Sequence, residues 1–500
     1  MSFCFRSLIL FACFVPSLAA QVVQHPSKKV PLHLDSGVRA NPLLLPKRIY
    51  SQTIEVPGAL WLRLEFDKRT RLEGESILRI TSIEDGAVQF FQAKSLSDYA
   101  YLSAFFNGSS VRLDLLAAGR TFGNRVLVRF AEAGTIPSPG RPTTICGPTD
   151  DRKPSKDPRV ARQYPTGCTT WLISAYAGLT AGHCTRNTRQ MMHFNVPLSS
   201  SSGRIRLPGP QDQYAYVASS VLRLSSGVGR DWSVFRVVRN SNTGLYPGEK
   251  QGSWFKLGKI PSKGNIRITG HGVSYVNRPR SQTQQTHFGP LVRVASTYLG
   301  YRVDTTGGNS GSPVIDEATG HAVGIHTHGG CRSSGSTSFN YGTRVDRSDL
   351  QKAIQAVLNQ VVLAIYQPFG KGCSGTAGIP SLVKVQTPEL GGALKVSATN
   401  LPGSSWLMFG SSKSKWLGLT LPFSLTGAGA PGCSVLVSFD LYAAPLSVVS
   451  GKAQFNQAIP NDKRLLGIRF YNQVLSLDSR ANRLGLVLSN GAEGVIGGLR

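Results

Sequence analysis

Residues 307–313 of this 500-residue chain read GGNSGSP, a serine set among glycines. A nucleophilic serine must present its Oγ while nearby backbone N–H groups converge on a developing oxyanion, and glycines allow that close approach. An ordinary Gly/Ser turn or a sharp strand-to-helix turn would carry similar letters. The residues after Gly311 read SPVIDE, which lacks a helical pattern and argues against the strand-to-helix turn. Ser310 is therefore a candidate nucleophile.

A second motif lies upstream, where residues 180–184 read TAGHC after the apolar run CTTWLISAY. A serine hydroxyl needs a base at neutral pH, and an imidazole titrates in the right range. A lone histidine is usually structural or exposed to solvent. Here Cys184 could tether the loop to Cys168 and so fix the position of the ring. This makes His183 the candidate base.

An acidic residue opens a third apolar segment, GRDWSVF at residues 229–235. A buried carboxylate beside the imidazole would fix its tautomer, which is the task expected of Asp231. Taken alone, an Asp before a strand is most often a turn residue. Asp212 is the main alternative, but its Gln, Tyr and Pro neighbours indicate an exposed loop.

Together, TAGHC, DWSV and GGNSGSP resemble the chymotrypsin-like serine proteases, whose catalytic residues follow the chain order His, Asp, Ser. The resemblance covers roughly residues 146–360. It implies a mainly β fold class, a chymotrypsin-like double β-barrel with a C-terminal helix. The apolar face and capping-box spacing of residues 349–362 predict that helix.

The same resemblance assigns roles to individual residues. It implies a catalytic triad of His183, Asp231 and Ser310. It also implies an oxyanion hole formed by the backbone N–H groups of Gly308 and Ser310. The activity expected from this set is that of a serine endopeptidase.

Substrate preference depends on residues near the nucleophile. Asn309 replaces the Asp of animal trypsins, and GGNSGSPV resembles the glutamyl-endopeptidase branch, in which a Thr and a His bind the acidic side chain of the substrate. Thr305 and His326 match those two positions. Asp304 stands where trypsin-like enzymes place the acid that binds Lys or Arg, so that alternative stays open. We expect cleavage after Glu or Asp. His326 and His328 could suggest a metal site, but the sequence offers no evident third ligand.

Six cysteines follow the first twenty residues, and an even number in an oxidising compartment predicts three disulfides among fifteen possible pairings. The family resemblance supports a Cys168–Cys184 bridge. The other two expected bridges are Cys146–Cys331 and Cys373–Cys433. No C-x-x-C pair is present, and we expect no metal and no cofactor.

The remaining segments predict flanking modules. Residues 45–133 alternate in short apolar and polar runs, which favours an N-terminal β domain over 21–134. Residues 135–165 are rich in Pro, Gly and charge and indicate a linker or extended arm. The protease domain is expected over 146–365, and residues 366–500 resemble a β-sandwich-like module. The N-terminal domain could be a propeptide, an inhibitor or a binding module. The linker offers basic cleavage points at Arg152, Lys153, Lys156, Arg159 and Arg162.

The first twenty residues have the pattern of a signal peptide, with one Arg, an apolar run and small residues near Ala19 and Ala20. We therefore expect a secreted, extracellular protein with no membrane span. The net charge of +28 is concentrated in residues 146–365, which hold 26 Lys and Arg against 11 Asp and Glu. The basic residues are scattered, so no specific nucleic-acid partner is expected.

Three classes of function remain open. A monomeric endopeptidase acting on protein or peptide substrates is the preferred interpretation. A non-catalytic adhesion protein on a protease scaffold and a secreted polyanion binder are the alternatives. The complete triad motifs favour the enzyme.

Overall fold

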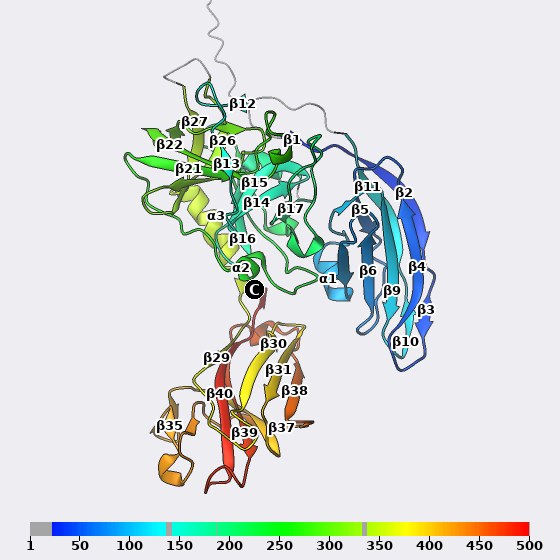
Figure 1. Ribbon diagram of the computed structural model, residues 1–500, viewed down its shortest axis with the longest axis vertical. Coiled ribbons are helices and arrows are strands. Elements are labelled where there is room, and N and C mark those ends of the chain that lie inside the picture. Colours follow the sequence, from blue (N-terminus) through cyan, green and yellow to red (C-terminus); the bar gives the residue numbers. More distant parts are fainter. Residues whose placement is uncertain (1–22, 137–142, 188, 333–337, 500) are drawn as a thin grey trace, which may run out of the picture. The chain divides into compact units, whose positions relative to one another are not determined.

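The computed structural model describes residues 23–136, 143–187, 189–332 and 338–499, and the expected signal peptide lies outside them. The chain divides into two compact units, Met1–Val357 and Leu358–Arg500. Most regular structure in both units is β, as the sequence predicts (Figure 1). Among the described residues, no helix is both long and apolar enough to cross a bilayer.

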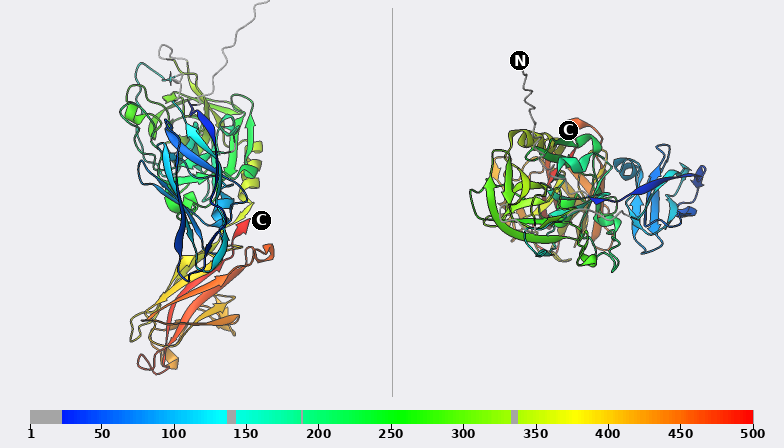
Figure 2. Two further views of the ribbon diagram at one scale, coloured as in Figure 1. Left: turned by 90° about the vertical axis from the view of Figure 1, so that its right-hand side faces the viewer. Right: turned by 90° about the horizontal axis from the view of Figure 1, so that it is seen from above.

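The N-terminal β domain consists of two antiparallel four-stranded sheets that share one apolar core, drawn blue to cyan in Figures 1 and 2. The first sheet contains β2 (Ser27–Asp35), β11 (Leu127–Gly134), β5 (Trp61–Phe66) and β8 (Phe106–Asn107). The second contains β4 (Lys47–Glu55), β9 (Ser110–Ala117), β6 (Ile77–Ser82) and β7 (Val88–Phe91). A short pair, β3 (Arg39–Asn41) with β10 (Thr121–Asn124), and helix α1 (Ala93–Asp98) complete the domain. Alternating apolar residues face the core between the sheets, as period-two patterning requires.

This domain shares its core with the segment that follows it. The ring of Phe105 meets the ring of Tyr164 edge-on at 4.8 Å, and Trp61 meets the same tyrosine at 5.6 Å. The Gln213 side chain accepts a hydrogen bond from the backbone N–H of Phe105 and donates one to its carbonyl. All four side chains are buried. The contact is therefore a continuous hydrophobic core in which the Gln213 amide is hydrogen-bonded to the backbone.

An open sheet, or half-barrel, follows the N-terminal domain. Its strands are β14 (Val160–Tyr164), β15 (Thr166–Leu172), β16 (Ala177–Thr180), β17 (Met191–His193), β18 (Gln213–Ala215), β19 (Leu222–Ser225) and β20 (Asp231–Arg236). The order is β18-β17-β14-β15-β16-β20-β19, and β1 (Val23–Gln24) pairs with β15. Helix α2 (Pro247–Gln251) follows the last strand. The segment that the sequence indicates as linker, 135–165, thus ends in a barrel strand, β14.

A closed six-stranded barrel comes next in the chain. Its strands are β21 (Asn265–Gly270), β22 (Gln285–Val294), β23 (Tyr298–Tyr301), β25 (Pro313–Asp316), β26 (Ala322–His328) and β27 (Asn340–Arg344). The pairing of β22 with β23 closes the ring. Two strands of the arm pair with this barrel: β13 (Lys153–Pro154) with β22, and β12 (Thr143–Thr144) with β24 (Thr305–Thr306).

Helix α3 (Ser348–Leu358) closes the first unit, and it is shorter than the expected span of 349–362. Leu350, Ile354 and Val357 are buried on its apolar face, as the sequence predicts. Val361–Val362 instead form a short strand, β28. Two adjacent β-branched residues favour an extended backbone over a helix, which fits this early end.

The second unit, residues 358–500, is also a β structure with its own core. The five-stranded sheet contains β29 (Ile365–Phe369), β40 (Leu486–Val495), β39 (Arg469–Leu477), β32 (Ser405–Gly410) and β37 (Tyr442–Leu446). The three-stranded sheet contains β30 (Ser381–Gln386), β31 (Ala393–Thr399) and β38 (Lys452–Ala458). Short pairs are formed by β28 with β41 (Gly498–Leu499), β33 (Lys415–Trp416) with β34 (Leu419–Thr420), and β35 (Phe423–Ser424) with β36 (Ser434–Val435).

Three buried histidines of the first unit make its stability sensitive to acid. Burial, and then the charge of Arg162, lowers the pKa of His25 to about 4 and of His271 to about 3, and lowers the pKa of His193 well below its ordinary value. These histidines stay neutral in the folded state, whereas the unfolded chain binds protons below about pH 6.5. Stability that is present above that pH is therefore lost as the pH falls towards the folded pKa values.

We expect the free energy of unfolding to fall by about 2 kcal/mol per pH unit near pH 6.5, steepening to about 4 kcal/mol per pH unit near pH 5, from these three groups together. Denaturant unfolding at several pH values measures this slope. Replacing His193→Met should reduce the slope by about one proton, whereas His33→Asn, a change at an exposed histidine, is the control. Unfolding at pH 5.5 without proton uptake would contradict the prediction.

Candidate active site

The pairing of β16 with β20 brings His183 and Asp231 together. His183 lies in a short 3₁₀ turn, η1 (Gly182–Thr185), directly after β16, and Asp231 is the first residue of β20. The Asp231 carboxylate accepts the backbone N–H of His183 at 3.0 Å, and its other oxygen lies 2.5 Å from His183 Nδ1. Asp231 is 1% exposed. One carboxylate oxygen of Asp231 thus fixes the backbone of His183, and the other fixes its ring.

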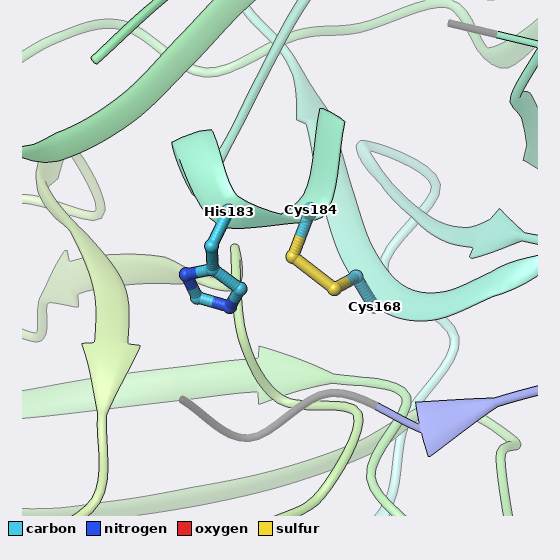
Figure 3. A group of neighbouring side chains, drawn as sticks. All are labelled: Cys168, His183 and Cys184. Atoms are coloured by element: carbon cyan, nitrogen blue, oxygen red, sulfur yellow. A yellow bond between two sulfur atoms is a disulfide. The ribbon is translucent and has the colours of Figure 1, made fainter. Parts of the chain in front are cut away.

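The loop that carries His183 is fixed on its other side. The Cys168–Cys184 disulfide joins the residue after His183 to strand β15 (Figure 3). A Cβ on Gly182 would lie 1.9 Å from the carbonyl oxygen of Leu224, so only glycine fits there. The ring atom Nε2 of His183 is buried and has no hydrogen-bond partner among the described residues. It is the nitrogen opposite the one that faces Asp231.

Ser310 lies in the loop between β24 and β25, against strand β15. Its carbonyl oxygen accepts the backbone N–H of Thr169 at 2.8 Å, and Cys184 Sγ lies 3.8 Å from the same oxygen. Gly308, two residues before Ser310, and Gly311, directly after it, adopt positive φ values of 100° and 91°, which favour glycine. A Cβ on Gly311 would lie 2.1 Å from a carbonyl oxygen of β15. The glycines therefore let this loop reach the strand that the disulfide ties to the histidine.

The alternative acid, Asp212, is engaged elsewhere. Its carboxylate accepts hydrogen bonds from Lys250 Nζ and Asn195 Nδ2, both at 2.8 Å. The ion pair with Lys250 lies in a loop after β17, on the other edge of the sheet from β20. Asp231, and not Asp212, is the acid that contacts the histidine.

Thr305 and His326 are both fully buried. Thr305 Oγ1 lies 2.8 Å from Thr144 Oγ1 of the arm and accepts a hydrogen bond from Asn340 Nδ2 at 3.0 Å. His326 Nδ1 lies 2.7 Å from the hydroxyl of Tyr301. Burial, followed by the charges of His328 and His183, lowers the pKa of His326 to about 3. His326 is therefore a neutral imidazole near pH 7.

Asp304 holds the arm. One carboxylate oxygen accepts the backbone N–H of Cys146 at 2.8 Å, and the other accepts that of Asp151 at 2.9 Å. His287 Nδ1 accepts the backbone N–H of Asp304 itself. The side chain is almost completely buried, at 2% exposure. Both oxygens are engaged by the polypeptide, which differs from the open carboxylate that a basic substrate side chain requires.

The three disulfides of the structure are Cys146–Cys331, Cys168–Cys184 and Cys373–Cys433, the pairs expected from the sequence. The first ties the arm to the loop after β26. The third lies within the second unit.

His328 is a site residue to which the sequence assigned no role. Its ring centroid lies 6.1 Å from that of His183. Burial lowers the pKa of His328, while the charge of Asp231 opposes that shift. The pairing of β26 with β27 shifts register between His326 and His328, so the alternation of a regular strand could not have placed His328 from the position of His326.

Two groups of described side chains have the proximity of a metal site, and neither offers a free ligand set. In the first, Cys168 and Cys184 are joined as a disulfide beside His183 (Figure 3). The second consists of Asp151, His287 and Asp304. There both Asp304 oxygens and His287 Nδ1 already accept backbone N–H groups.

Comparison with known protein families matches residues 168–325 to the trypsin-like peptidase domain. The chain therefore contains a trypsin-like peptidase domain. Among curated proteins it is similar to the glutamyl endopeptidase of Bacillus licheniformis, with 29% identity over 194 residues. It is also similar to a Bacillus subtilis protein named extracellular metalloprotease, with 29% identity over 210 residues. These matches cover 36% and 41% of this chain, and 56% and 62% of those proteins.

Solved structures similar to this chain include a Glu endopeptidase in complex with MPD, at 19% identity and a TM-score of 0.33. That match covers 43% of this chain and all of the other. Another is the thermostable serine protease AL20 from an extremophilic microorganism, at 13% identity and a TM-score of 0.32, covering 40% of this chain and 98% of the other.

Proposed function

We propose that this protein is a secreted serine endopeptidase in which His183, Asp231 and Ser310 form the catalytic triad. The observation that carries the proposal is the pair of hydrogen bonds that the Asp231 carboxylate accepts from the backbone N–H and the ring of His183, beside the loop of Ser310. The half-barrel and the closed barrel would be the two halves of a chymotrypsin-like fold, with the site between β16, β20 and the β24–β25 loop.

The geometry supports acyl transfer in two steps. Ser310 Oγ attacks the peptide carbonyl while His183 Nε2 takes its proton, and Asp231 stabilises the resulting imidazolium. The backbone N–H groups of Gly308 and Ser310 would bind the oxyanion. His183 then donates the proton to the leaving amine, and water, activated by the same ring, hydrolyses the acyl-enzyme.

Incubation with casein and with an active-serine phosphonate tests the enzyme class. We expect the purified protein to cleave casein and to be labelled at Ser310, at least after limited proteolysis in the linker. A protein that neither cleaves nor labels after such treatment would favour the non-catalytic scaffold. A peptide map of the labelled protein identifies the serine.

For substrate preference we propose cleavage after Glu or Asp. The support is that His326 is neutral and that two backbone N–H groups engage Asp304. Burial raises the pKa of Tyr301, so its hydroxyl keeps its proton and can donate to His326 Nδ1. The imidazole proton would then sit on Nε2, where it can donate to a substrate carboxylate.

Thr305→Val tests this preference with a change that keeps the volume of the side chain. We expect kcat/KM on peptides ending in Glu to fall by about 10- to 30-fold, because the hydroxyl would no longer donate to the carboxylate. Peptides ending in Phe should be affected much less. Thr327→Val, at a buried threonine on β26, is the control. Preferred cleavage after Lys or Arg, or an equal loss on all peptides, would contradict the proposal.

We also propose that the N-terminal β domain is a propeptide that keeps the site closed. Strand β1 pairs with β15 at Gly167, and His25 Nε2 lies 3.2 Å from the Gln282 side chain. A Cβ on Gly308 would lie 2.3 Å from Gln282 Nε2, so this amide covers the oxyanion loop. Ser310 is 0% exposed in the full chain. Release of β1 and His25 would free the Gln282 side chain, and we propose that substrate reaches Ser310 only after this release.

A further inference from the structure

Arg152 is a buried cation in the arm that precedes the half-barrel. Its side chain is 2% exposed and forms a two-pronged ion pair with Asp150, at 2.8 Å from Nε and 2.6 Å from Nη2. A buried guanidinium needs further acceptors for its remaining donors.

Those acceptors lie in the loop of the nucleophile. Arg152 Nη1 donates to Thr306 Oγ1 at 2.7 Å and to Asn309 Oδ1 at 3.4 Å, and Nη2 donates to the carbonyl of Val273 at 2.8 Å. Thr306 Oγ1 donates to the same carbonyl at 2.9 Å, and Asn309 Oδ1 accepts the backbone N–H of Thr306 at 3.0 Å. The guanidinium therefore joins both ends of the segment 306–309 to a neighbouring loop.

The backbone around Arg152 is shaped to admit the guanidinium. A Cβ on Gly272 would lie 2.4 Å from Arg152 Nη1 and 2.2 Å from Asn309 Oδ1, so a side chain at Gly272 would collide with the network. Asn309 directly precedes the nucleophile. Gly308, between the two tied positions, has a φ of 100°. Its backbone N–H direction thus depends on how Thr306 and Asn309 are held.

We propose that Arg152 is a positioning residue for the oxyanion hole, which holds the 306–309 segment so that the Gly308 N–H points at the developing oxyanion. The proposal rests on the serine-peptidase function proposed above. A guanidinium suits this task because its planar donors are fixed relative to one another. Without it, three oxygen acceptors lose a buried charged donor, and the segment is free to rearrange. The loss should fall on kcat, because the oxyanion exists only in the transition state.

Arg152→Met tests the proposal, and Arg159→Met is a matched control. Arg159 forms the same two-pronged ion pair with the acid two residues before it, Asp157, and its guanidinium packs over Phe255, away from the nucleophile loop. We expect Arg152→Met to lower kcat by roughly 100-fold with KM changed less than about threefold. The rate of phosphonate labelling should fall in parallel. Added guanidinium ion should restore part of the activity, and Arg159→Met should keep the wild-type kcat.

The outcomes separate this proposal from the proposed function. A wild type that neither cleaves nor labels overturns both. A labelled, active wild type with Arg152→Met at the wild-type kcat, or with losses equal to those of Arg159→Met, overturns the positioning role alone. If Arg152→Met does not fold, Arg152→Lys tests the positioning role instead, because lysine keeps the positive charge but lacks the planar guanidinium donors. A folded Arg152→Lys with a lowered kcat supports the role, and one with an unchanged kcat overturns it.

Discussion

Replacing Ser310 with alanine is expected to lower kcat by about six orders of magnitude, to the level left by substrate binding and the oxyanion hole. The reason is that His183 would have no hydroxyl to deprotonate and no acyl-enzyme could form. Phosphonate labelling should disappear as well. Hydrolysis of a fluorogenic peptide, with the melting temperature as a test of folding, measures the effect.

Ser312 provides a matched control in the same loop. It is also fully buried, and its Oγ packs so closely on Gly270 that a Cβ on that glycine would lie only 2.1 Å from it. Ser312→Ala removes the same atom two residues further on and should keep kcat within about threefold. If Ser312→Ala abolishes labelling and Ser310→Ala does not, the nucleophile has been misassigned.

Asp231→Asn is expected to lower kcat by about four orders of magnitude near neutral pH. One Asp231 oxygen accepts the backbone N–H of His183 and the other faces Nδ1. If the amide oxygen keeps the backbone hydrogen bond, the amide NH₂ faces Nδ1 and favours the tautomer with its proton on Nε2. That tautomer cannot accept the proton of Ser310. The pH profile of kcat on a peptide substrate measures the loss.

Asp212→Asn is the control for this change, because Asp212 is the acid that the sequence offered as an alternative. It would weaken an ion pair with Lys250 that lies away from the histidine. We expect kcat to stay within about threefold of wild type, with only a small loss of stability. A loss of activity in Asp212→Asn that matches Asp231→Asn would contradict the assignment of the acid.

The sequence predicts the residues whose chemistry depends on short local motifs. Adjacent glycines and a cysteine mark the loops around His183 and Ser310 in the sequence, and the structure brings His183 together with the expected Asp231. Arg152 and Asp304 behave differently. Apart from Asp150, the partners of the Arg152 side chain described above lie more than 100 positions away in the chain, as do the two backbone N–H groups that Asp304 accepts, and a local pattern carries no information about such contacts. The sequence therefore offered Arg152 as a cleavage point, although it is buried.

Some element boundaries were also missed for physical reasons. The strand β2 reads SKKVPLHLD, and its two lysines and a proline weaken the period-two signal. The strand β14 reads VARQY and lies inside residues 135–165, whose Pro, Gly and charge content indicates a linker or extended arm. Arg162 is nevertheless fully buried, where its guanidinium donates to the backbone carbonyls of Gln282 and Arg206. Tertiary hydrogen bonds thus admit a charge into a strand that composition alone would exclude.

The core shared by the N-terminal domain and the half-barrel has a consequence for timing. A cut in the linker would not by itself free the site, because Trp61 and Phe105 would remain packed on Tyr164. Separation exposes these rings to water, so it requires an activated step comparable to unfolding. Activity would then appear after a lag, whose length is set by the lifetime of that core. The cut would begin activation, and the rate at which Trp61 and Phe105 separate from Tyr164 would set how long the cut protein stays inactive.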